Sequence, residues 1–165
     1  MKTQYLIIIL LFTLSACGFH LRGSQQSLSM AISEVYVSNT HANEVTNEVR
    51  LQLVGSGVKV VESKEMAKFA LKLDKESFDR TVLSVSGRTG KVEEYQLTFT
   101  VNMSVIDDSG NELLSDEQIY LTREYTFDEN AVLSKFGEEQ LLRDELVSEA
   151  ATQIVRRLDV ETRSK

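Results

Sequence analysis

The feature that most constrains the fold is an unbroken alternation of apolar and polar side chains over residues 94–105. The apolar positions are Tyr95, Leu97, Phe99, Val101, Met103 and Val105. The polar positions between them are Glu94, Gln96, Thr98, Thr100, Asn102 and Ser104. Because successive side chains of a strand point to opposite faces, this pattern predicts a strand with one face in a core. The opposite face is expected to lie either in water or against a polar partner.

The chain on both sides of this strand predicts further extended structure. The run Asp-Asp-Ser-Gly-Asn at 107–111 has the composition of a hairpin turn, and it predicts a return strand over 117–127. The apolar face of that return strand is interrupted by Arg123. Upstream, residues 58–73 predict either one long strand with an irregularity near 63–67 or two short strands.

Two other segments carry apolar side chains at helical spacing. The first segment has them at Val45, Val49 and Leu53. The second has them at Leu142, Leu146, Ala150, Ile154 and Leu158. The first helix is expected to end near Gly55 and Gly57, because glycine is common where a helix ends in a left-handed residue. The second is expected to begin at Ala131 or Glu138 and to end at Leu158.

Together with a first strand over 31–37, these elements give the order β-α-β-β-β-α. The order predicts an α+β fold of the two-layer α/β sandwich type. About four strands would form a mixed sheet, with both helices packed on one face. The first helix would act as the crossover that allows its two flanking strands to run parallel.

The N-terminus has the layout of a cleaved secretory signal. Lys2 is followed by an apolar run over 5–14, and small residues then lead to Cys17, the only cysteine. The tetrad Leu-Ser-Ala-Cys resembles the lipobox of bacterial lipoproteins. This resemblance implies cleavage before Cys17, a diacylglycerol on its thiol and an acyl chain on its amino group. Gly18 follows, instead of the aspartate associated with retention at the inner membrane, so the implied destination is the outer membrane.

Two other interpretations of this segment remain open. It could be an uncleaved signal anchor, although a helix over 5–14 would rise only about 15 Å against about 30 Å of hydrocarbon. Cys17 could also be an ordinary residue near a conventional cleavage site. The lipoprotein interpretation divides the chain into a signal peptide at 1–16, a lipidated tether at 17–30, a single domain at 31–160 and a polar tail at 161–165.

Composition argues against several classes of function. The formal net charge of −7 becomes −8 when the signal peptide takes Lys2 with it, so binding of nucleic acid through bulk charge is not expected. Lipid on the single cysteine leaves no disulfide, and His20 and His41 alone do not make a zinc site. A nucleophilic triad needs a base beside the serine, and only those two histidines could serve. We therefore expect no catalytic residues, no metal and no cofactor beyond the lipid on Cys17.

A loop at 86–91 places Arg88 and Lys91 between and beside two glycines on an otherwise acidic chain. One interpretation is a hairpin tip whose charges only face water. The other is a site for an anionic group such as a phosphorylated glycolipid, with the backbone N–H groups of the glycines close to the ligand.

Four separate stretches carry a resemblance to one known family. They are Cys-Gly-Phe-His-Leu-Arg-Gly at 17–23, the basic loop at 86–91, Glu-Tyr-Gln-Leu at 94–97 and Arg-Glu-Tyr-Thr-Phe-Asp at 123–128. In order and spacing the chain resembles the LPS-assembly lipoprotein LptE family over essentially its whole mature length. Phe19 stands where tryptophan is frequent in that family.

The resemblance implies a function without catalysis. Members of the family share this fold and act as the plug and assembly partner of the LptD outer-membrane β-barrel, which inserts lipopolysaccharide (LPS) into the outer leaflet. The resemblance also implies that Arg88 and Lys135 contact LPS. We add Lys91 because it lies beside the loop glycines. The implied location is the outer membrane, lipid-anchored and facing the periplasm and the barrel lumen.

A function of a different class stays open. The chain could be a free-standing, periplasm-facing outer-membrane lipoprotein that binds a ligand or inhibits an envelope enzyme. Such a protein is expected to have a concave apolar pocket.

Overall fold

A computed structural model describes residues 30–128 and 132–163. Its strands are β1 (Glu34–Thr40), β2 (Lys59–Val61), β3 (Phe69–Val85), β4 (Val92–Asp107) and β5 (Glu112–Thr126). Its helices are α2 (Asn43–Gly55), the 3₁₀ turn η1 (Lys64–Met66) and α3 (Val132–Arg163). The strands form one sheet in the order β2-β1-β3-β4-β5. β1 runs parallel to β2 and β3, and the β3–β4 and β4–β5 pairs are antiparallel.

The expected α+β architecture is confirmed, with five strands where about four were expected. The additional strand arises at the irregularity near 63–67, where η1 turns the chain between β2 and β3. β2 therefore pairs with β1 as a short parallel edge strand, and β3 begins as a separate strand. α2 is the crossover between the parallel strands β1 and β2, as expected.

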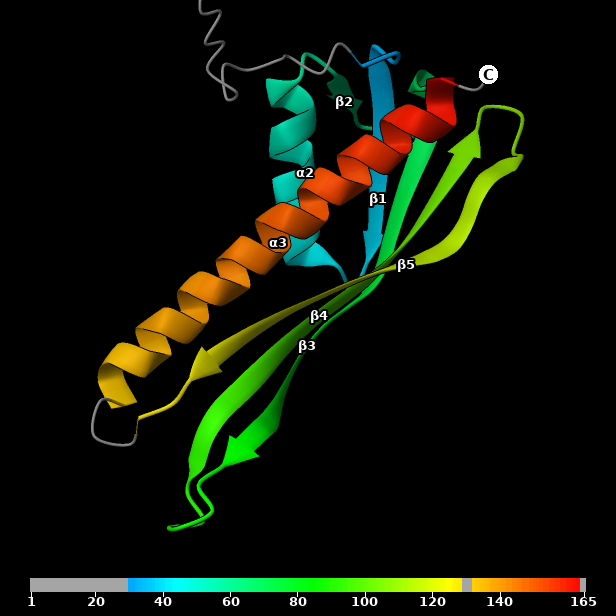
Figure 1. The fold of residues 1–165 in the computed structure, drawn as a ribbon. Coiled ribbons are helices and arrows are strands. Elements are labelled where there is room, and N and C mark those ends of the chain that lie inside the picture. Colours follow the sequence, from blue (N-terminus) through cyan, green and yellow to red (C-terminus); the bar gives the residue numbers. More distant parts are fainter. Residues whose placement is uncertain (1–29, 129–131, 164–165) are drawn as a thin grey trace, which may run out of the picture.

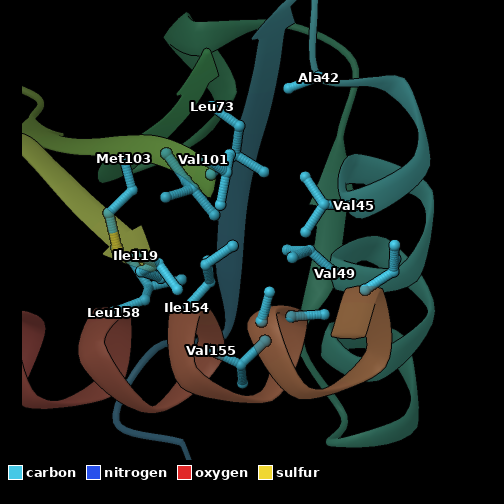
Figure 2. Close-up of a cluster of buried hydrophobic side chains, with 14 of the residues drawn as sticks. Ala42, Val45, Val49, Leu73, Val101, Met103, Ile119, Ile154, Val155 and Leu158 are labelled. Atoms are coloured by element: carbon cyan, nitrogen blue, oxygen red, sulfur yellow. The ribbon is translucent and has the colours of Figure 1, made fainter. Parts of the chain in front are cut away.

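Both helices cover the same face of the sheet, and the core lies between these two layers (Figure 1). Figure 2 shows Val45 and Val49 of α2 and Ile154 of α3 pointing toward Leu73 and Val101 of the sheet. All five side chains are fully buried. Burial of each such side chain stabilises the fold by roughly 1.5–3 kcal/mol. Because this stabilisation requires apolar side chains on the buried face of each helix, their spacing in the sequence predicted both helices.

The strand predicted from the alternation is confirmed. Its five apolar side chains from Leu97 to Val105 are each at most 1% exposed, and Tyr95 is half-buried. On the return strand, Arg123 interrupts the apolar face because its guanidinium reaches α3 and pairs with Glu149. The hairpin between the two strands is closed by Asp107, whose carboxylate accepts hydrogen bonds from the backbone and side chain of Asn111.

β3 is longer than the sequence indicated, because a β-bulge changes which residues face the core. Leu73 pairs with Met103, but Phe78 pairs with Phe99, so β3 has one extra residue between them. The extra residue lies near Lys75, whose φ is +56°. Core-facing positions are therefore odd-numbered before the bulge and even-numbered after it. The strand continues to Val85, although the apolar alternation in its sequence stops at Leu73.

α3 also extends beyond the predicted end at Leu158, through Arg163. Residues 161–163 of the expected polar tail are therefore helical. Thr162 is buried, and its hydroxyl is satisfied by donating to the carbonyl of Leu158 at 2.8 Å. Asp159 is buried as well, and it accepts hydrogen bonds from the backbone N–H of Ala31 and from Arg163. The end of the helix thus holds the start of the described chain.

β3 and β4 project past the helical layer as a long hairpin (Figure 1). β1 pairs with β3 only at Ala70–Asp74, so the remaining length of β3 lies beyond β1. The tip of this hairpin and the start of β1 lie at opposite ends of the molecule, because β1 and β3 are parallel. We call the hairpin end the distal end.

Candidate functional site

The distal end begins at the basic turn, residues 86–91, which joins β3 to β4. Ser86 closes the turn by donating its N–H to the carbonyl of Lys91 at 2.7 Å and by accepting from the N–H of Gly90 at 2.8 Å. Gly90 has φ +70°, a conformation that L side chains rarely adopt. Arg88 and Lys91 are both exposed on this one turn, so the structure brings two of the predicted LPS-binding residues together.

The second interpretation of this turn places the backbone N–H groups of its glycines close to an anionic ligand. The N–H of Gly90 is already hydrogen-bonded inside the turn, to the carbonyl of Ser86. Gly90 is needed instead for its left-handed backbone. An anion at this turn would therefore be bound mainly by the cationic side chains.

Four side chains from three elements meet between the projecting hairpin and the first turns of α3. We call this group the distal clasp: Arg80 of β3, Tyr125 of β5, and Glu139 and Arg143 of α3. Glu139 accepts hydrogen bonds from Tyr125 at 2.7 Å, from Arg80 at 3.0 Å and from Arg143 at 3.0 Å. The side chain of Glu139 is 13% exposed, so this carboxylate joins the three elements at a largely buried point.

Aromatic rings fix the two guanidinium groups of the clasp. Arg80 lies 4.8 Å from the ring centroid of Tyr95, and Arg143 lies 4.8 Å from that of Phe78. Tyr95 in turn stacks on Tyr125 at 5.8 Å, and Phe78 packs on Phe99 at 4.7 Å. Each cation–π contact stabilises by about 0.5–1 kcal/mol where water still reaches the pair. The clasp therefore joins the hairpin to α3 through hydrogen bonds and ring contacts together.

The clasp shifts the pKa values of its members. Burial of the Glu139 carboxyl disfavours its charge, but hydrogen bonds from Tyr125, Arg143 and Arg80 outweigh that effect and lower its pKa. Burial of the Tyr125 phenol and its bond to the Glu139 carboxylate raise the pKa of Tyr125 to about 12. Glu139 is thus a carboxylate and Tyr125 a neutral phenol at neutral pH.

The sequence did not reveal the clasp. Glu139 and Arg143 have the i, i+4 spacing of a helical ion pair, which was a usable signal. Arg80 could not be assigned to it, because the residue faces α3 only after the bulge in β3. Its partner Glu139 is also 59 positions away in the chain.

The other predicted site residues are described less fully. Lys135 lies in the first turns of α3, one helical turn before Glu139, and its side chain lies outside the described residues. α3 begins toward the distal end, so the backbone of Lys135 lies on the same side of the molecule as the basic turn (Figure 1). Cys17 and the tether at 17–30, except for Met30, lie outside the described residues.

The sheet face opposite the helices is polar along three strands. Cross-strand partners at these positions are polar on β3, β4 and β5 alike, apart from the phenol ring of Tyr120. We call this the polar sheet face: Lys72, Asp74, Ser77, Asp79, Thr81, Gln96, Thr98, Thr100, Asn102, Ser104, Gln118, Tyr120, Thr122 and Glu124. Asn102, on the middle strand of this face, donates to Asp116 at 2.7 Å, and Asp116 also pairs with Lys75 at 3.5 Å. A face of this kind suits a hydrated, polar counterpart.

Two hollows on the described surface have mixed linings. One of about 360 Å³ is lined by Ile32 and Phe69 together with Glu34 and Lys68. One of about 350 Å³ is lined by Met103, Ile119 and Val160 together with Arg156 and the ion pair of Arg157 with Glu117. Charged side chains thus line part of each hollow, whereas the ligand-binding alternative predicts an apolar pocket. Within residues 30–128 and 132–163, no His, Cys, Asp or Glu side chains gather in a group of three or more suited to a metal ion. No helix in the same part of the chain is long and apolar enough to span a membrane.

Comparison with known proteins identifies what the chain is similar to. A family model described as "LptE: Lipopolysaccharide-assembly" matches residues 32–158. The LPS-assembly lipoprotein LptE of Pectobacterium atrosepticum is 33% identical over 150 residues, covering 87% of this chain and 77% of that protein. The protein of the same name from Photorhabdus laumondii is 30% identical over 149 residues, covering 87% and 78%.

Solved structures show the same fold. The rare lipoprotein B of Shewanella oneidensis superposes with a TM-score of 0.70 at 27% identity, covering 79% of this chain and 97% of that one. Lipoprotein B of Nitrosomonas europaea gives a TM-score of 0.74 at 26% identity, covering 88% and 92%.

Proposed function

The chain belongs to the LptE lipopolysaccharide-assembly family, and from this premise we propose that it is the plug and assembly partner of the LptD β-barrel. In this role it takes part in the transport and insertion of lipopolysaccharide at the outer membrane and binds LPS directly. It works as a non-enzymatic lipoprotein without a cofactor. Its anchor is the acylated Cys17, which holds it at the outer membrane, facing the periplasm and the barrel lumen.

The polar sheet face is the observation that carries the plug assignment. The lumen of a large outer-membrane barrel is polar and hydrated. A plug needs a broad surface of uncharged and mixed-charge groups that exchanges hydrogen bonds with such a wall. Three adjacent strands supply that surface here, with Thr98 and Thr122 directly opposite each other near its centre.

The distal end supports the second part of the proposal, direct contact with LPS. Lipid A carries phosphate groups, and Arg88 and Lys91 present two exposed cations on one turn. Lys135 follows on α3, whose start is fixed to the hairpin by the distal clasp. Each charge-assisted contact is worth about 1.5–3 kcal/mol, which orients a glycolipid and still allows its release.

Copurification from outer-membrane extracts tests the plug assignment. Wild-type chain is expected to bring down one large barrel near stoichiometry. Gln118→Trp adds bulk to the polar sheet face and is expected to reduce this yield. Gln153→Trp, a matched exchange on the exposed side of α3, is expected to leave it unchanged. Recovery of the wild-type chain without a barrel would refute the assignment.

A charge reversal tests the LPS contacts separately. Arg88→Asp combined with Lys135→Asp is expected to weaken binding of purified LPS while leaving association with the barrel intact. Unchanged LPS binding by this variant would end that part of the proposal and leave a purely structural role.

A further inference from the structure

Apolar side chains are exposed beside the distal clasp, on the side toward the hairpin tip. Val82 is the next core-facing residue of β3 after Arg80, because it pairs with Tyr95 on β4. Phe136 lies on α3 three positions before Glu139, so the two share the side of the helix that meets the hairpin. Val82 is 47% exposed and Phe136 is 61% exposed. Both side chains therefore meet water just beyond the point where the hairpin and the helix are joined.

On the other side of the clasp, the hairpin and α3 are packed together. Phe78 of β3 packs on Phe99, and the guanidinium of Arg143 lies over the Phe78 ring. Packing between the two elements is thus closer inside the clasp than beyond it, where Val82 and Phe136 remain exposed.

The same end of the molecule is cationic. Residues 80–92 include Arg80 of the clasp, Arg88 and Lys91 but no acidic residue, on a chain with a formal net charge of −7. Val85, which is 55% exposed, ends β3 directly before the basic turn. We call the three exposed apolar side chains the distal apolar patch: Val82, Val85 and Phe136. Exposed apolar groups beside exposed cations complement an amphipathic anion, in which a charged part and an apolar part are joined.

Two other counterparts fit this patch less well. The wall of a barrel lumen is polar and hydrated, which suits the polar sheet face but not exposed valine and phenylalanine side chains. The membrane that would hold the acylated Cys17 is reached through the tether, and the chain enters β1 at the end opposite the hairpin tip (Figure 1). A single amphipathic molecule that passes the distal end meets neither objection.

We propose that the distal apolar patch contacts acyl chains of the same LPS molecule whose phosphates the basic turn binds. This inference rests on the proposed function, and it adds the lipid portion of the ligand to the phosphate contacts. Acyl chains leave water when they pack on Val82, Val85 and Phe136, so the contact favours acylated over deacylated LPS. The distal end thereby distinguishes an acylated glycolipid from a phosphorylated sugar.

Binding of intact LPS and of deacylated LPS, which retains its phosphates, tests this inference. The wild-type full chain in phosphatidylcholine nanodiscs is expected to bind the intact form at least about tenfold more tightly, after subtraction of binding to empty nanodiscs. Val82→Ser with Phe136→Ser is expected to remove this preference. The control, Leu51→Ser with Val54→Ser, alters α2 side chains that are 69% and 63% exposed and is expected to keep it.

The possible outcomes separate this inference from the proposed function. Equal binding of the two LPS forms by the wild type, or the same preference in both double variants, would overturn the inference and leave the phosphate contacts standing. Phosphatidylglycerol that displaces intact LPS at equal concentration would overturn it too, because the patch would then accept any acylated anion. If the wild type binds neither form, the direct LPS contact of the proposed function fails as well.

Photocrosslinking in intact outer membranes gives an independent readout. A photoreactive residue at position 136 is expected to form an adduct with an acyl chain of LPS, identified by mass spectrometry after hydrolysis. The same residue at position 51, on the exposed side of α2, is expected to form none. Adducts from position 136 with the barrel alone would overturn the inference, because the patch would then be a protein contact.

Discussion

Replacement of Glu139 by glutamine tests whether the distal clasp holds the projecting hairpin to α3. Glu139→Gln keeps the size and leaves a carbonyl that can accept from Tyr125, but it removes the negative charge. Arg80 and Arg143 then face each other without a compensating carboxylate. The expected result is a less stable domain whose hairpin is less firmly joined to the helix.

The size of the effect follows from the contacts and their exposure. A hydrogen bond to a charged partner contributes about 1.5–3 kcal/mol when it is shielded from water. The Arg80 and Arg143 side chains are 43% and 29% exposed. Water can therefore replace much of the interaction that each guanidinium loses with the carboxylate. We expect the free energy of unfolding to fall by about 1–2 kcal/mol, which lowers Tm by a few degrees.

Chemical denaturation followed by circular dichroism measures this difference. Glu145→Gln is the matched control, since Glu145 lies on the same helix and is exposed. It is expected to change stability by less than about 0.5 kcal/mol. A double-mutant cycle with Arg80→Met should give a coupling energy of about 0.5–1.5 kcal/mol between positions 80 and 139. Equal stability of the two glutamine variants, or no coupling, would refute the clasp.

The pH dependence of the same variants provides a second check with a defined sign. The pKa of Glu139 is lower in the folded chain than its ordinary value. The stabilisation of the fold by ionised Glu139 is therefore complete above that ordinary pKa, near 4.5. This stabilisation is lost as the pH falls through the lower pKa of the folded state. The stability difference between wild type and Glu139→Gln should shrink as the pH falls below about 4.5. A difference that stays constant down to pH 3 would contradict the assignment.

Three further predictions concern other positions. The pKa of Tyr125 is raised to about 12 in the folded chain, so the stabilisation by its neutral phenol is complete below pH 10 and is lost as the pH rises toward 12. In denaturation measured at a series of pH values, Tyr125→Phe should lose less stability than the wild type between about pH 10 and 12. Gly90→Ala should destabilise the hairpin tip by about 1–2 kcal/mol because φ is +70° there, whereas Gly87→Ala should have a much smaller effect on thermal unfolding. Asp159→Ala removes the acceptor of the Ala31 N–H and should lower the free energy of unfolding by about 1–3 kcal/mol in urea titrations; an unchanged midpoint would refute that anchor.

The elements that could be predicted from the sequence are those with one uninterrupted period. Residues 94–105 alternate without a break, and the core-facing side of β4 followed directly. α2 was equally clear, because Val45, Val49 and Leu53 repeat every four residues and all three are buried. In both elements the buried side chains lie on one face, so their spacing in the local sequence is enough to identify the element and its buried face.

The elements that were missed have a change of phase or a polar residue in the core layer. The bulge near Lys75 moves the inward positions of β3 from odd to even numbers, so a single alternation could not be followed across it. α3 was ended too early because Asp159 and Thr162 are polar, although hydrogen bonds allow both to be buried. Pairs distant in sequence, such as Arg80 with Glu139, are determined by the tertiary fold and have no local signature.

Site-specific photocrosslinking in intact outer membranes tests the central claim most directly. A photoreactive residue replaces Thr98 at the centre of the polar sheet face or, as the comparison, Gln153 on the exposed side of α3. The account predicts a strong adduct from position 98 with one large β-barrel protein, mapped to residues that face its lumen, and a weaker adduct from position 153. Position 98 giving no adduct, or adducts with soluble periplasmic proteins alone, would contradict it.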